Sequence, residues 1–445
     1  MTTDNDYPVI IVGGGPCGLL SSLLLARFGV KNIVLERHPD ISIHPKAMAL
    51  TRRTGEVFAQ LGLYERMSAA DVTTDEYALS AWCRSLSGEI LGTSPMVEDA
   101  EAFTPCVRLH CPQPHVEAVL AREINQHPLA EIKHYCQVES VEETSGGVTV
   151  TYTDRATEEA RTLTTDYLIA SDGAKSRIRD MLGIEADGPG DLGHFINIYF
   201  RANYGPRLEE RRAILYQSIG ESFFETFVSV NGQDLWLMHH YLEEGESIAD
   251  YPESRVIDLV RKSSGMPEVP VEIISELPWV MSPKVAREWR KGRCFLVGDS
   301  AARLSPTGGL GMNTGLQGAH NLAWKLAAVV NGLAGEALLD TYQAERKPVA
   351  EFTSGNSNAN FQELYNIVAS AMEGRWDDTR QLIANSRRAG SILGQDLGMT
   401  YDSTAITSDE TPAPAPEDPI NDYAPSGRPG GRAPYLRLKS EGQPS

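Results

Sequence analysis

A glycine-rich turn near the start of the chain has the residue types and spacing that bind a dinucleotide. Gly13, Gly15 and Gly18 form a G-x-G-x-x-G motif, in which the glycines permit a tight turn, close approach of a pyrophosphate and close helix–strand packing. The apolar run 9–12 precedes the motif and an apolar helix is expected after it, so a helix N-terminus would face the phosphates. Glu36, 23 residues after Gly13, would end the next strand and accept hydrogen bonds from ribose hydroxyls. The combination predicts a dinucleotide site.

Two further motifs predict that this dinucleotide is a flavin. One is an apolar strand that runs into D-G-x-x-S-x-x-R at Asp172, and the other is a strand that delivers Asp299. The carboxylate of Asp299 can accept hydrogen bonds from polyol hydroxyls. The glycines at 308, 309 and 311 would let the backbone lie against a flat ring. The expected helix that follows aims its positive end at the ring. A reduced flavin carries negative charge along its N1 and C2-oxygen edge, so this helix would stabilise the reduced anion.

The elements that must position these motifs are of two kinds. Residues 8–36 alternate strand, helix and strand, which favours a parallel sheet. Residues 131–170 have short alternating runs typical of an antiparallel meander, and 185–275 contain further strand-like segments that predict a second sheet. Helix is expected from 311 to about 333 and from 338 to about 389. The predicted fold class is α/β, with a Rossmann-like FAD-binding domain, an inserted mixed-sheet substrate domain and C-terminal helices.

We expect four segments along the chain. They are the first part of the FAD-binding domain at 1–180, the substrate-binding sheet domain at 181–275, the second part of the FAD-binding domain with its helices at 276–400, and an extended tail at 401–445. Residues 408–445 are crowded with proline, glycine and charge, and such a stretch cannot order itself alone. It would therefore lie across the body or lead to another domain.

Bulk composition excludes several classes of partner. The chain has 445 residues, 41% of them hydrophobic and 22% charged, as in an ordinary globular protein. Its formal charge of -20 repels phosphate backbones and anionic membranes, so neither nucleic acid nor a membrane is expected as a partner. No apolar stretch approaches the roughly 18 residues that cross a bilayer, and the N-terminus lacks a basic signal region. These features predict a cytoplasmic protein. We expect a monomer or homodimer, although the sequence itself does not identify the oligomeric state.

Six cysteines are too few and too scattered for a disulfide framework, which agrees with a reducing compartment. Cys106 and Cys111 have the C-x4-C spacing of some flavin disulfide reductases, and with His110 and His115 they could imitate a metal cluster. A redox pair would need a second nucleotide motif, and a zinc site would show tighter paired spacing. We favour a strand or loop that approaches a helix, and expect no metal.

The three motifs resemble those of the class A flavoprotein monooxygenases, a family similar to p-hydroxybenzoate hydroxylase and phenol hydroxylase, and especially its bacterial hydroxylases of polyketides and chlorophenols. The motifs match in order and approximate spacing, and the resemblance covers nearly all of residues 7–436. It implies one FAD per chain, NADPH or NADH as a transient co-substrate, O2, and a flavin C4a-hydroperoxide that hydroxylates a small aromatic or polyketide-like molecule. Baeyer-Villiger or epoxide-forming oxygenation, and FAD binding without catalysis, remain open. A flavin halogenase would carry a W-x-W-x-I-P motif, which is absent from this sequence.

The resemblance gives roles to individual positions. Lys46 takes the place of a basic residue that touches the FAD phosphates, and Gln113 matches a glutamine on the flavin chain, with Arg108 just upstream. Pro306 matches the proline whose carbonyl faces the substrate hydroxyl, and Asp172 resembles the aspartate that links FAD and nicotinamide binding. The full set of cofactor-binding candidates is Gly13, Gly15, Pro16, Cys17, Gly18, Glu36, Arg37, Lys46, Arg108, Gln113, Asp172, Asp299, Pro306, Gly309, Leu310, Gly311, Met312 and Asn313.

Few side chains are expected to act directly, because the family's oxygen chemistry needs exclusion of water and correct orientation of the substrate. The catalytic candidates are Pro306, Arg53 and Tyr216. Further pocket candidates in the second sheet are His194, Tyr199, Arg201, Trp236, Met238 and His240, about half of which would point away from the pocket because strand residues alternate. The chain departs from the family at 298–303, where many relatives read G-D-A-A-H, and at 317–319, where many read Q-D-A. The tail resembles the lead into a thioredoxin-like third domain that we expect to be absent.

Overall fold

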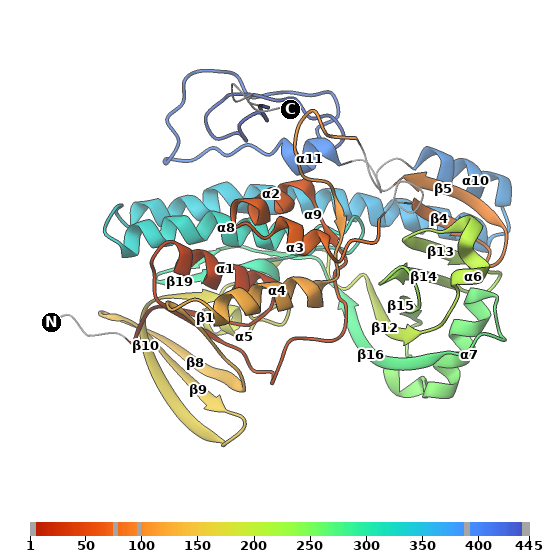
Figure 1. The fold of residues 1–445 in the computed structure, drawn as a ribbon, viewed down its shortest axis with the longest axis horizontal. Helices are drawn as coiled ribbons and strands as arrows, with labels where there is room; N and C mark the ends of the chain where they lie inside the picture. The colour runs from red at the N-terminus through yellow and green to blue at the C-terminus, as the bar shows by residue number, and fades with distance from the viewer. Residues whose placement is uncertain (1–5, 74–78, 96–98, 387–391, 438–445) are drawn as a thin grey trace, which may run out of the picture.

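A parallel sheet forms the centre of the larger body (Figure 1). β1 (Tyr7–Val12) pairs in parallel with β2 (Asn32–Leu35) and with the C-terminal end of β10 (Glu159–Ala170). The sheet continues through β7 (Ala130–Lys133) on one side and β19 (Cys294–Leu296) on the other. Val9, Ile10 and Ile11 are fully buried, as expected for strands covered on both faces by helices. The predicted FAD-binding architecture is confirmed.

The computed structural model describes residues 6–73, 79–95, 99–386 and 392–437. Within these ranges, no helix is both long enough and apolar enough to cross a membrane.

Helices cover the parallel sheet. α1 (Pro16–Arg27) begins with proline in its first turn, where a missing N–H costs nothing, and buries its apolar run against α4 (Gln113–Asn125) and α8 (Gly311–Val330). α2 (Arg52–Gln60) packs on α3 (Tyr64–Ser68) and α8. The N-termini of α1 and α8 therefore both lie in the larger body of the protein.

The predicted meander is also present. β8 (Cys136–Thr144), β9 (Gly147–Asp154) and the first part of β10 pair antiparallel. The remaining short elements are β3 (Ala49–Leu50), β6 (Leu109–His110), α5 (Arg177–Met181), β11 (Ala186–Asp187), β17 (Lys284–Ala286), β18 (Arg290–Lys291), β20 (Ala302–Arg303), η1 (Glu209–Arg211), η2 (Ile248–Asp250) and η3 (Gly298–Ser300).

The second sheet has the order β16-β12-β15-β14-β13-β4-β5. Its strands are β4 (Leu79–Cys83), β5 (Ile90–Pro95), β12 (Gly193–Arg201), β13 (Leu215–Ile219), β14 (Phe224–Ser229), β15 (Leu235–Leu242) and β16 (Glu272–Met281). The sheet is mixed as predicted, because β4 runs parallel to β13 and the other pairs are antiparallel. It differs from the expected 181–275 segment in two ways. β4 and β5 come from the range assigned to the first part of the FAD-binding domain, and β16 extends to Met281.

The two faces of the second sheet have different surroundings. Ile196, Ile198 and Phe200 of β12 are buried in one core cluster with Val256 and Val260 of α7 (Glu253–Ser264), and α6 (Gly205–Leu208) adds Leu208 to that cluster. We call the opposite face the near face, because it lies toward the FAD-binding body. Its residues include Asn197, Tyr199, Gln217, Thr226, Leu237, His239, Ser275 and Trp279.

Contacts between the near face and the FAD-binding body fix this orientation. Tyr199 and Leu237 share a hydrophobic cluster with Met48, which lies in the loop after β2. Nδ1 of His44, from the same loop, lies 2.8 Å from Oγ of Ser275. The near face is therefore the side of the second sheet that meets the FAD-binding body.

One long helix joins the two bodies (Figure 1). α9 (Ala337–Met372) packs against α8 in the larger body. Toward its other end, Ile367 joins a cluster with Trp82 and Ile219 of the second sheet. α10 (Trp376–Asn385) follows after a break, so the expected helix from 338 to about 389 is present as two helices.

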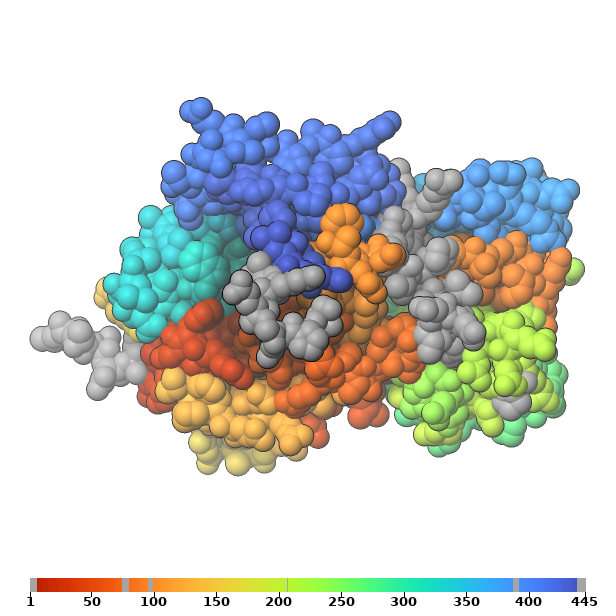
Figure 2. All heavy atoms as spheres, turned by 45° about the horizontal axis from the view of Figure 1, so that its top comes forward, coloured from red at the N-terminus to blue at the C-terminus, as the bar shows by residue number. Residues whose placement is uncertain are grey.

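The C-terminal segment lies across the larger body. α11 (Leu393–Leu397) is followed by irregular chain to residue 437, which forms the blue layer in Figure 2. The backbone N–H of Tyr401 donates to the carbonyl of Gly430 at 2.8 Å, and Arg432 pairs with Glu56 of α2. This segment thus follows the first of the two courses predicted for it, whereas residues 438–445 of the expected tail lie outside the described residues.

Candidate active site

The glycine turn between β1 and α1 is closed by packing on two sides and open on the third. Gly13 has φ +105°, and a Cβ there would lie 2.4 Å from the carbonyl oxygen of Ser171. A Cβ at Gly18 would lie 2.0 Å from the carbonyl oxygen of Gly13, whereas a Cβ at Gly15 would meet nothing within 4 Å. Gly15 is the N-cap of α1, with Pro16 next. The first turn of α1 therefore faces open space, which fits a pyrophosphate.

Glu36 lies against the same turn. Its carboxylate accepts hydrogen bonds from the backbone N–H of Gly14 at 2.6 Å and from that of His38 at 2.8 Å. A carboxylate offers about four lone-pair sites, so both oxygens keep capacity for the hydroxyls of a ribose. Arg37 is exposed, and its Nε lies 3.2 Å from Nε2 of His38.

Asp299 and Lys46 share one electrostatic environment. Asp299 is exposed to solvent, yet desolvation by the surrounding protein raises the pKa of its carboxyl group. The carboxylate therefore reaches solvent but has much of the protein around it. The positive charges of Arg303 and Lys46 oppose this rise, and Lys46 likewise opposes the burial that raises the pKa of Glu117. An exposed lysine at this position fits contact with phosphate groups.

The N-terminus of α8 is held by a buried asparagine. Oδ1 of Asn313 accepts a hydrogen bond from the backbone N–H of Thr51 at 2.9 Å, and its Nδ2 donates to the carbonyls of Ala49 and Gly309, each at 2.9 Å. A Cβ on Gly311 would meet nothing within 4 Å. Asn313 therefore acts here as a clamp, and the positive end of α8 lies beside open space at Gly311.

The loop before α8 presents backbone. Pro306 is exposed, and its carbonyl accepts one hydrogen bond from the N–H of Gly309 at 3.0 Å, which leaves its second lone pair available. Nη2 of Arg108 donates to the carbonyl of Gly308 at 3.1 Å. Gly308 and Gly309 have φ of +107° and +70°, which favour glycine. At the end of the loop Leu310 is buried, and Met312 packs partly against the main core.

Three other cofactor candidates are held by protein contacts. The carboxylate of Asp172 accepts hydrogen bonds from Oγ of Ser176 at 2.5 Å and from the N–H of Ile178 at 3.1 Å. Nε2 of Gln113 donates to Glu117 at 2.7 Å. The buried thiol of Cys17 has a raised pKa because of desolvation, so it is a neutral packing group. These contacts order the turns around the glycine motif.

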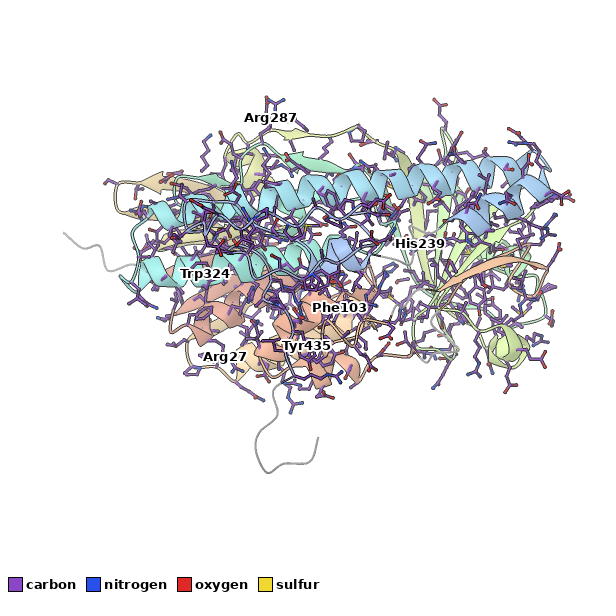
Figure 3. All side chains as sticks on the ribbon, turned by 90° about the horizontal axis from the view of Figure 1, so that it is seen from above. Arg27, Phe103, His239, Arg287, Trp324 and Tyr435 are labelled. Atoms are coloured by element: carbon purple, nitrogen blue, oxygen red, sulfur yellow. The ribbon has the colours of Figure 1, made fainter. Side chains whose placement is uncertain are left out.

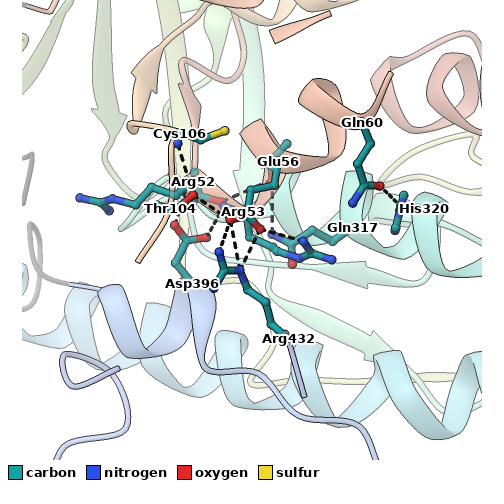
Figure 4. Close-up of polar contacts among 12 residues, drawn as sticks. Arg52, Arg53, Glu56, Gln60, Thr104, Cys106, Gln317, His320, Asp396 and Arg432 are labelled. Carbon is teal, nitrogen blue, oxygen red and sulfur yellow. Dashed lines mark hydrogen bonds and ion pairs between the residues drawn. The ribbon is translucent and has the colours of Figure 1, made fainter. Parts of the chain in front are cut away.

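The two catalytic candidates outside the loop make structural contacts. Nη1 of Arg53 pairs with Oε2 of Glu56 at 2.8 Å (Figure 4). Tyr216 is buried in the core on the α7 side of the second sheet. Its hydroxyl accepts from the N–H of Ala213 at 2.8 Å and donates to the carbonyl of Arg211 at 3.1 Å. This geometry favours packing for Tyr216, so we do not carry it into the proposed mechanism.

The pocket candidates of the second sheet divide between its two faces. Trp236 and Met238 lie in the core under α7, and Nδ1 of His240 lies 2.8 Å from the buried Glu225. Tyr199 lies on the near face. His194 and Arg201 are exposed, and Arg201 pairs with Asp234. Strand alternation thus puts Tyr199 and Arg201 on the near face, but Arg201 lies at the exposed end of β12, which leaves Tyr199 as the partly buried candidate there.

Other near-face residues were missed by sequence reasoning. His239, which Figure 3 labels where the second sheet meets the larger body, has Nδ1 2.6 Å from Oδ1 of Asn197. On α9, neither carboxamide atom of the buried Asn360 has a hydrogen-bond partner among the described residues, and its Nδ2 lies near Gly308. The available signal was strand parity: Asn197 and His239 share the odd-numbered register of Tyr199 and Leu237.

The cysteine and histidine cluster has ordinary contacts. Cys106 and Cys111 are buried free thiols, and burial raises their pKa values to about 11 and about 12. Nε2 of His110 lies 2.7 Å from the carbonyl of Ser229, and Nε2 of His115 lies 2.7 Å from that of Arg66. In the described part of the chain, no group of three or more His, Cys, Asp or Glu side chains could hold a metal ion.

Comparison with known proteins gives the same picture. A family model described as an FAD binding domain matches residues 6–357. A putative polyketide hydroxylase of Streptomyces halstedii is 35% identical over 456 residues, covering 99% of this chain and 78% of the relative.

Solved structures are similar over nearly the whole chain. The flavin-dependent monooxygenase PieE, in complex with FAD and substrate, superposes with a TM-score of 0.91 at 30% identity, covering 96% of this chain and 80% of that one. Aklavinone-11 hydroxylase, in a ternary complex with FAD and aklavinone, gives a TM-score of 0.83 at 29% identity, covering 98% and 80%.

Proposed function

The chain belongs to the FAD-dependent aromatic and polyketide hydroxylases, and we propose that it uses NADPH or NADH and O2 to hydroxylate a polycyclic, polyketide-like phenol. The observation that carries the proposal is that three separated stretches lie close together. These are the glycine turn with Glu36, the pair Lys46 and Asp299, and the loop 306–313 with the start of α8. A Cβ at Gly298 or Gly315 would meet Sγ of Cys17 in the glycine turn. The near face of the second sheet contacts the loop after β2, and this loop lies between the near face and the three stretches.

The residues present fit FAD. The open first turn of α1 would hold the pyrophosphate, Glu36 the adenosine ribose and Lys46 the phosphates. Asp299 would accept hydrogen bonds from the ribityl hydroxyls, with Arg108, Gln113 and the loop before α8 around the flavin chain and ring. FAD, when bound and reduced by NAD(P)H, supplies the oxygen-transfer chemistry.

The chain's own contribution is to orient the substrate, exclude water and stabilise charge. The N-terminus of α8 places a partial positive charge where the reduced ring is negative. The free lone pair of the Pro306 carbonyl would accept a hydrogen bond from a substrate hydroxyl. Substrate would lie between this loop and the near face, where Tyr199 offers an aromatic wall.

The remaining assignments complete the proposal. Asp172, beside the glycine turn, and Arg53, at the start of α2, are our candidates for coupling FAD binding to the nicotinamide cofactor. We propose a monomer or homodimer in the cytoplasm, supported by six unpaired cysteines. We keep the domain division at 180, 275 and 400, with β4 and β5 added to the substrate sheet.

The test is a purification followed by turnover. We expect a yellow protein with flavin absorbance near about 450 nm, and NADPH oxidation that hydroxylated polycyclic aromatics accelerate. The structure of the product, solved by nuclear magnetic resonance, distinguishes a hydroxylated ring from an isomeric lactone or epoxide. A colourless protein that does not take up FAD would refute the proposal.

A further inference from the structure

A row of polar side chains crosses the near face of the second sheet. Thr226 lies opposite both Gln217 and His239 in the strand register, and His239 lies opposite Asn197. Oγ1 of Thr226 donates to Oε1 of Gln217 at 2.7 Å. Nε1 of Trp279 donates to Oδ1 of Asn197 at 2.5 Å. Polar groups on an inward face are costly unless they are paired or meet a ligand.

The bonds to Asn197 fix the tautomer of His239. The indole N–H of Trp279 can only donate, so the Asn197 atom that faces it must be the carboxamide oxygen. The same oxygen lies 2.6 Å from Nδ1 of His239. Because an oxygen acceptor requires a donor, Nδ1 carries the proton, and in the neutral ring Nε2 is left with an acceptor lone pair.

Nε2 of His239 is available for a ligand. Among the contacts of the described residues, none is a hydrogen bond to this atom. Desolvation, together with the neighbouring His44, lowers the pKa of His239 to about 4, so the ring is neutral at physiological pH. The side chain nevertheless remains partly exposed, so a ligand can reach it.

A second ring nitrogen close by has the same character. His44, buried in the loop after β2, has Nδ1 beside Ser275, while its buried Nε2 has no hydrogen-bond partner in the described part of the chain. Desolvation also lowers its pKa to about 4, with a smaller contribution from Lys46. Two neutral imidazoles within electrostatic reach therefore present unpaired ring nitrogens between the sheet and the FAD-binding body.

The size of the pKa difference decides what His239 can do. An unperturbed phenol has a pKa of about 10, about six units above that of His239. Proton transfer from such a phenol to His239 is therefore strongly disfavoured. Acceptance of a hydrogen bond has no such barrier, so the geometry favours recognition of a hydroxyl that keeps its proton.

We propose that Nε2 of His239 selects substrates with a free aromatic hydroxyl group by accepting its hydrogen bond, and that Asn197 is the positioning residue that holds the ring in the required tautomer. This inference rests on the proposed hydroxylase function and names the chemical feature that its substrate must carry. An O-methylated analogue cannot donate, and it would leave Nε2 unpaired at a desolvated site.

The test compares two ligands on the FAD-loaded protein. We would measure the dissociation constants of 2,6-dihydroxyanthraquinone, whose hydroxyls are too far from the ring carbonyls to bond internally, and of its dimethyl ether by absorbance titration. The wild-type protein is expected to bind the dihydroxy compound at least about 10-fold more tightly, as loss of one hydrogen bond to a desolvated acceptor implies. If an FAD-loaded and active protein bound neither compound, or bound both equally, the inference would be overturned while the proposed function would stand.

Two variants of His239 separate recognition from structure. His239→Asn keeps a group near the position of Nδ1 but lacks one near Nε2, whereas His239→Gln keeps an acceptor near Nε2. We expect His239→Asn to reduce the preference to within about 2-fold, and His239→Gln to retain most of it. The matched control is His194→Asn on the exposed part of β12, which should behave as wild type. Undiminished preference in a folded, FAD-loaded His239→Asn protein would overturn the inference, whereas absence of FAD binding in the wild type would instead overturn the proposed function.

Discussion

The carboxylate of Asp396 accepts a hydrogen bond from the backbone N–H of Arg52 at 2.8 Å, although the two residues are 344 positions apart (Figure 4). Asp396 also accepts from the N–H of Arg53 at 3.3 Å. The N-cap of α2, Thr51, has no side-chain cap bond of its own. A side chain of α11 therefore supplies the cap of α2, which begins directly after the strand that Asn313 clamps to α8.

Removal of this cap should destabilise the protein. Asp396→Ala leaves two N–H groups of a buried helix end without an acceptor, so we expect a loss of about 1–3 kcal/mol in the free energy of unfolding. Asp396→Asn keeps one acceptor oxygen and should lose less. Urea denaturation of the FAD-loaded proteins measures both. Equal stability of all three would show that the distant cap contributes nothing.

The pair Arg432 and Glu56 gives a prediction with a pH signature. Arg432 is 9% exposed and Glu56 12%. Burial tends to raise the pKa of Glu56, but bonds from Arg432, Thr104 and Arg53 outweigh it, and the net pKa is lowered. A carboxyl group whose pKa is lower in the folded protein than in the unfolded chain stabilises the fold at pH values above its unfolded-state pKa. This contribution is lost as the pH falls through the folded-state pKa.

We therefore expect Arg432→Met to lose about 1–3 kcal/mol at pH 7, because the mostly buried carboxylate of Glu56 loses a charged partner while the bonds from Arg53 and Thr104 remain. The difference from wild type should shrink as the pH falls below the unfolded-state pKa of glutamate, about 4.3, and on through the lowered folded-state pKa of Glu56. Arg437→Met, at an exposed position of the same segment, is the control and should change stability by less than about 0.5 kcal/mol. A difference between Arg432→Met and wild type that does not depend on pH would contradict the assignment to Glu56.

The glycine turn predicts opposite effects at two nearby positions. A side chain at Gly15 meets open space, so Gly15→Val should leave the stability of the apoprotein nearly unchanged while it weakens FAD binding by about 100-fold or more. A side chain at Gly18 meets the carbonyl of Gly13, so Gly18→Ala should destabilise the apoprotein itself. Thermal unfolding of apoprotein and fluorescence titration with FAD measure the two effects. Normal FAD affinity in Gly15→Val would contradict the placement of the pyrophosphate at this turn.

The tautomer of His239 predicts how ligand preference depends on pH. In the wild type, with the pKa of His239 at about 4, Nε2 stays unprotonated and the preference for the dihydroxy ligand should be constant from pH 5.5 to 7.5. Asn197→Asp would place a negatively charged carboxylate beside Nδ1 and raise the pKa of His239 by about 1–3 units. The preference should then be lost as the pH falls through about 5–7, because a protonated Nε2 cannot accept. The groups that act on the ring are His44 and the introduced carboxylate, and a flat profile in Asn197→Asp would contradict the assigned tautomer.

Local signals in the sequence were sufficient for the parallel sheet and its cofactor turn. The run 9–12, the glycines of the first motif and Pro16 specify strand, turn and helix within a few residues. The φ angles and the close contacts that this turn requires involve mainly residues near one another in the sequence. The antiparallel meander and α8 were likewise predicted from periodicity. The family followed from three such motifs in order.

Tertiary structure decided which side chains share the site. The parallel pairing of β4 with β13 and the cap from Asp396 join segments that no local pattern connects. Periodicity places Tyr216 and His239 on opposite faces of the second sheet, but only packing against α7 on one side and the loop of His44 on the other shows which face meets the larger body. By itself the sequence determined the cofactor and the kinds of element, because those depend on near neighbours, whereas the substrate wall depends on contacts between distant chain segments that form only on folding.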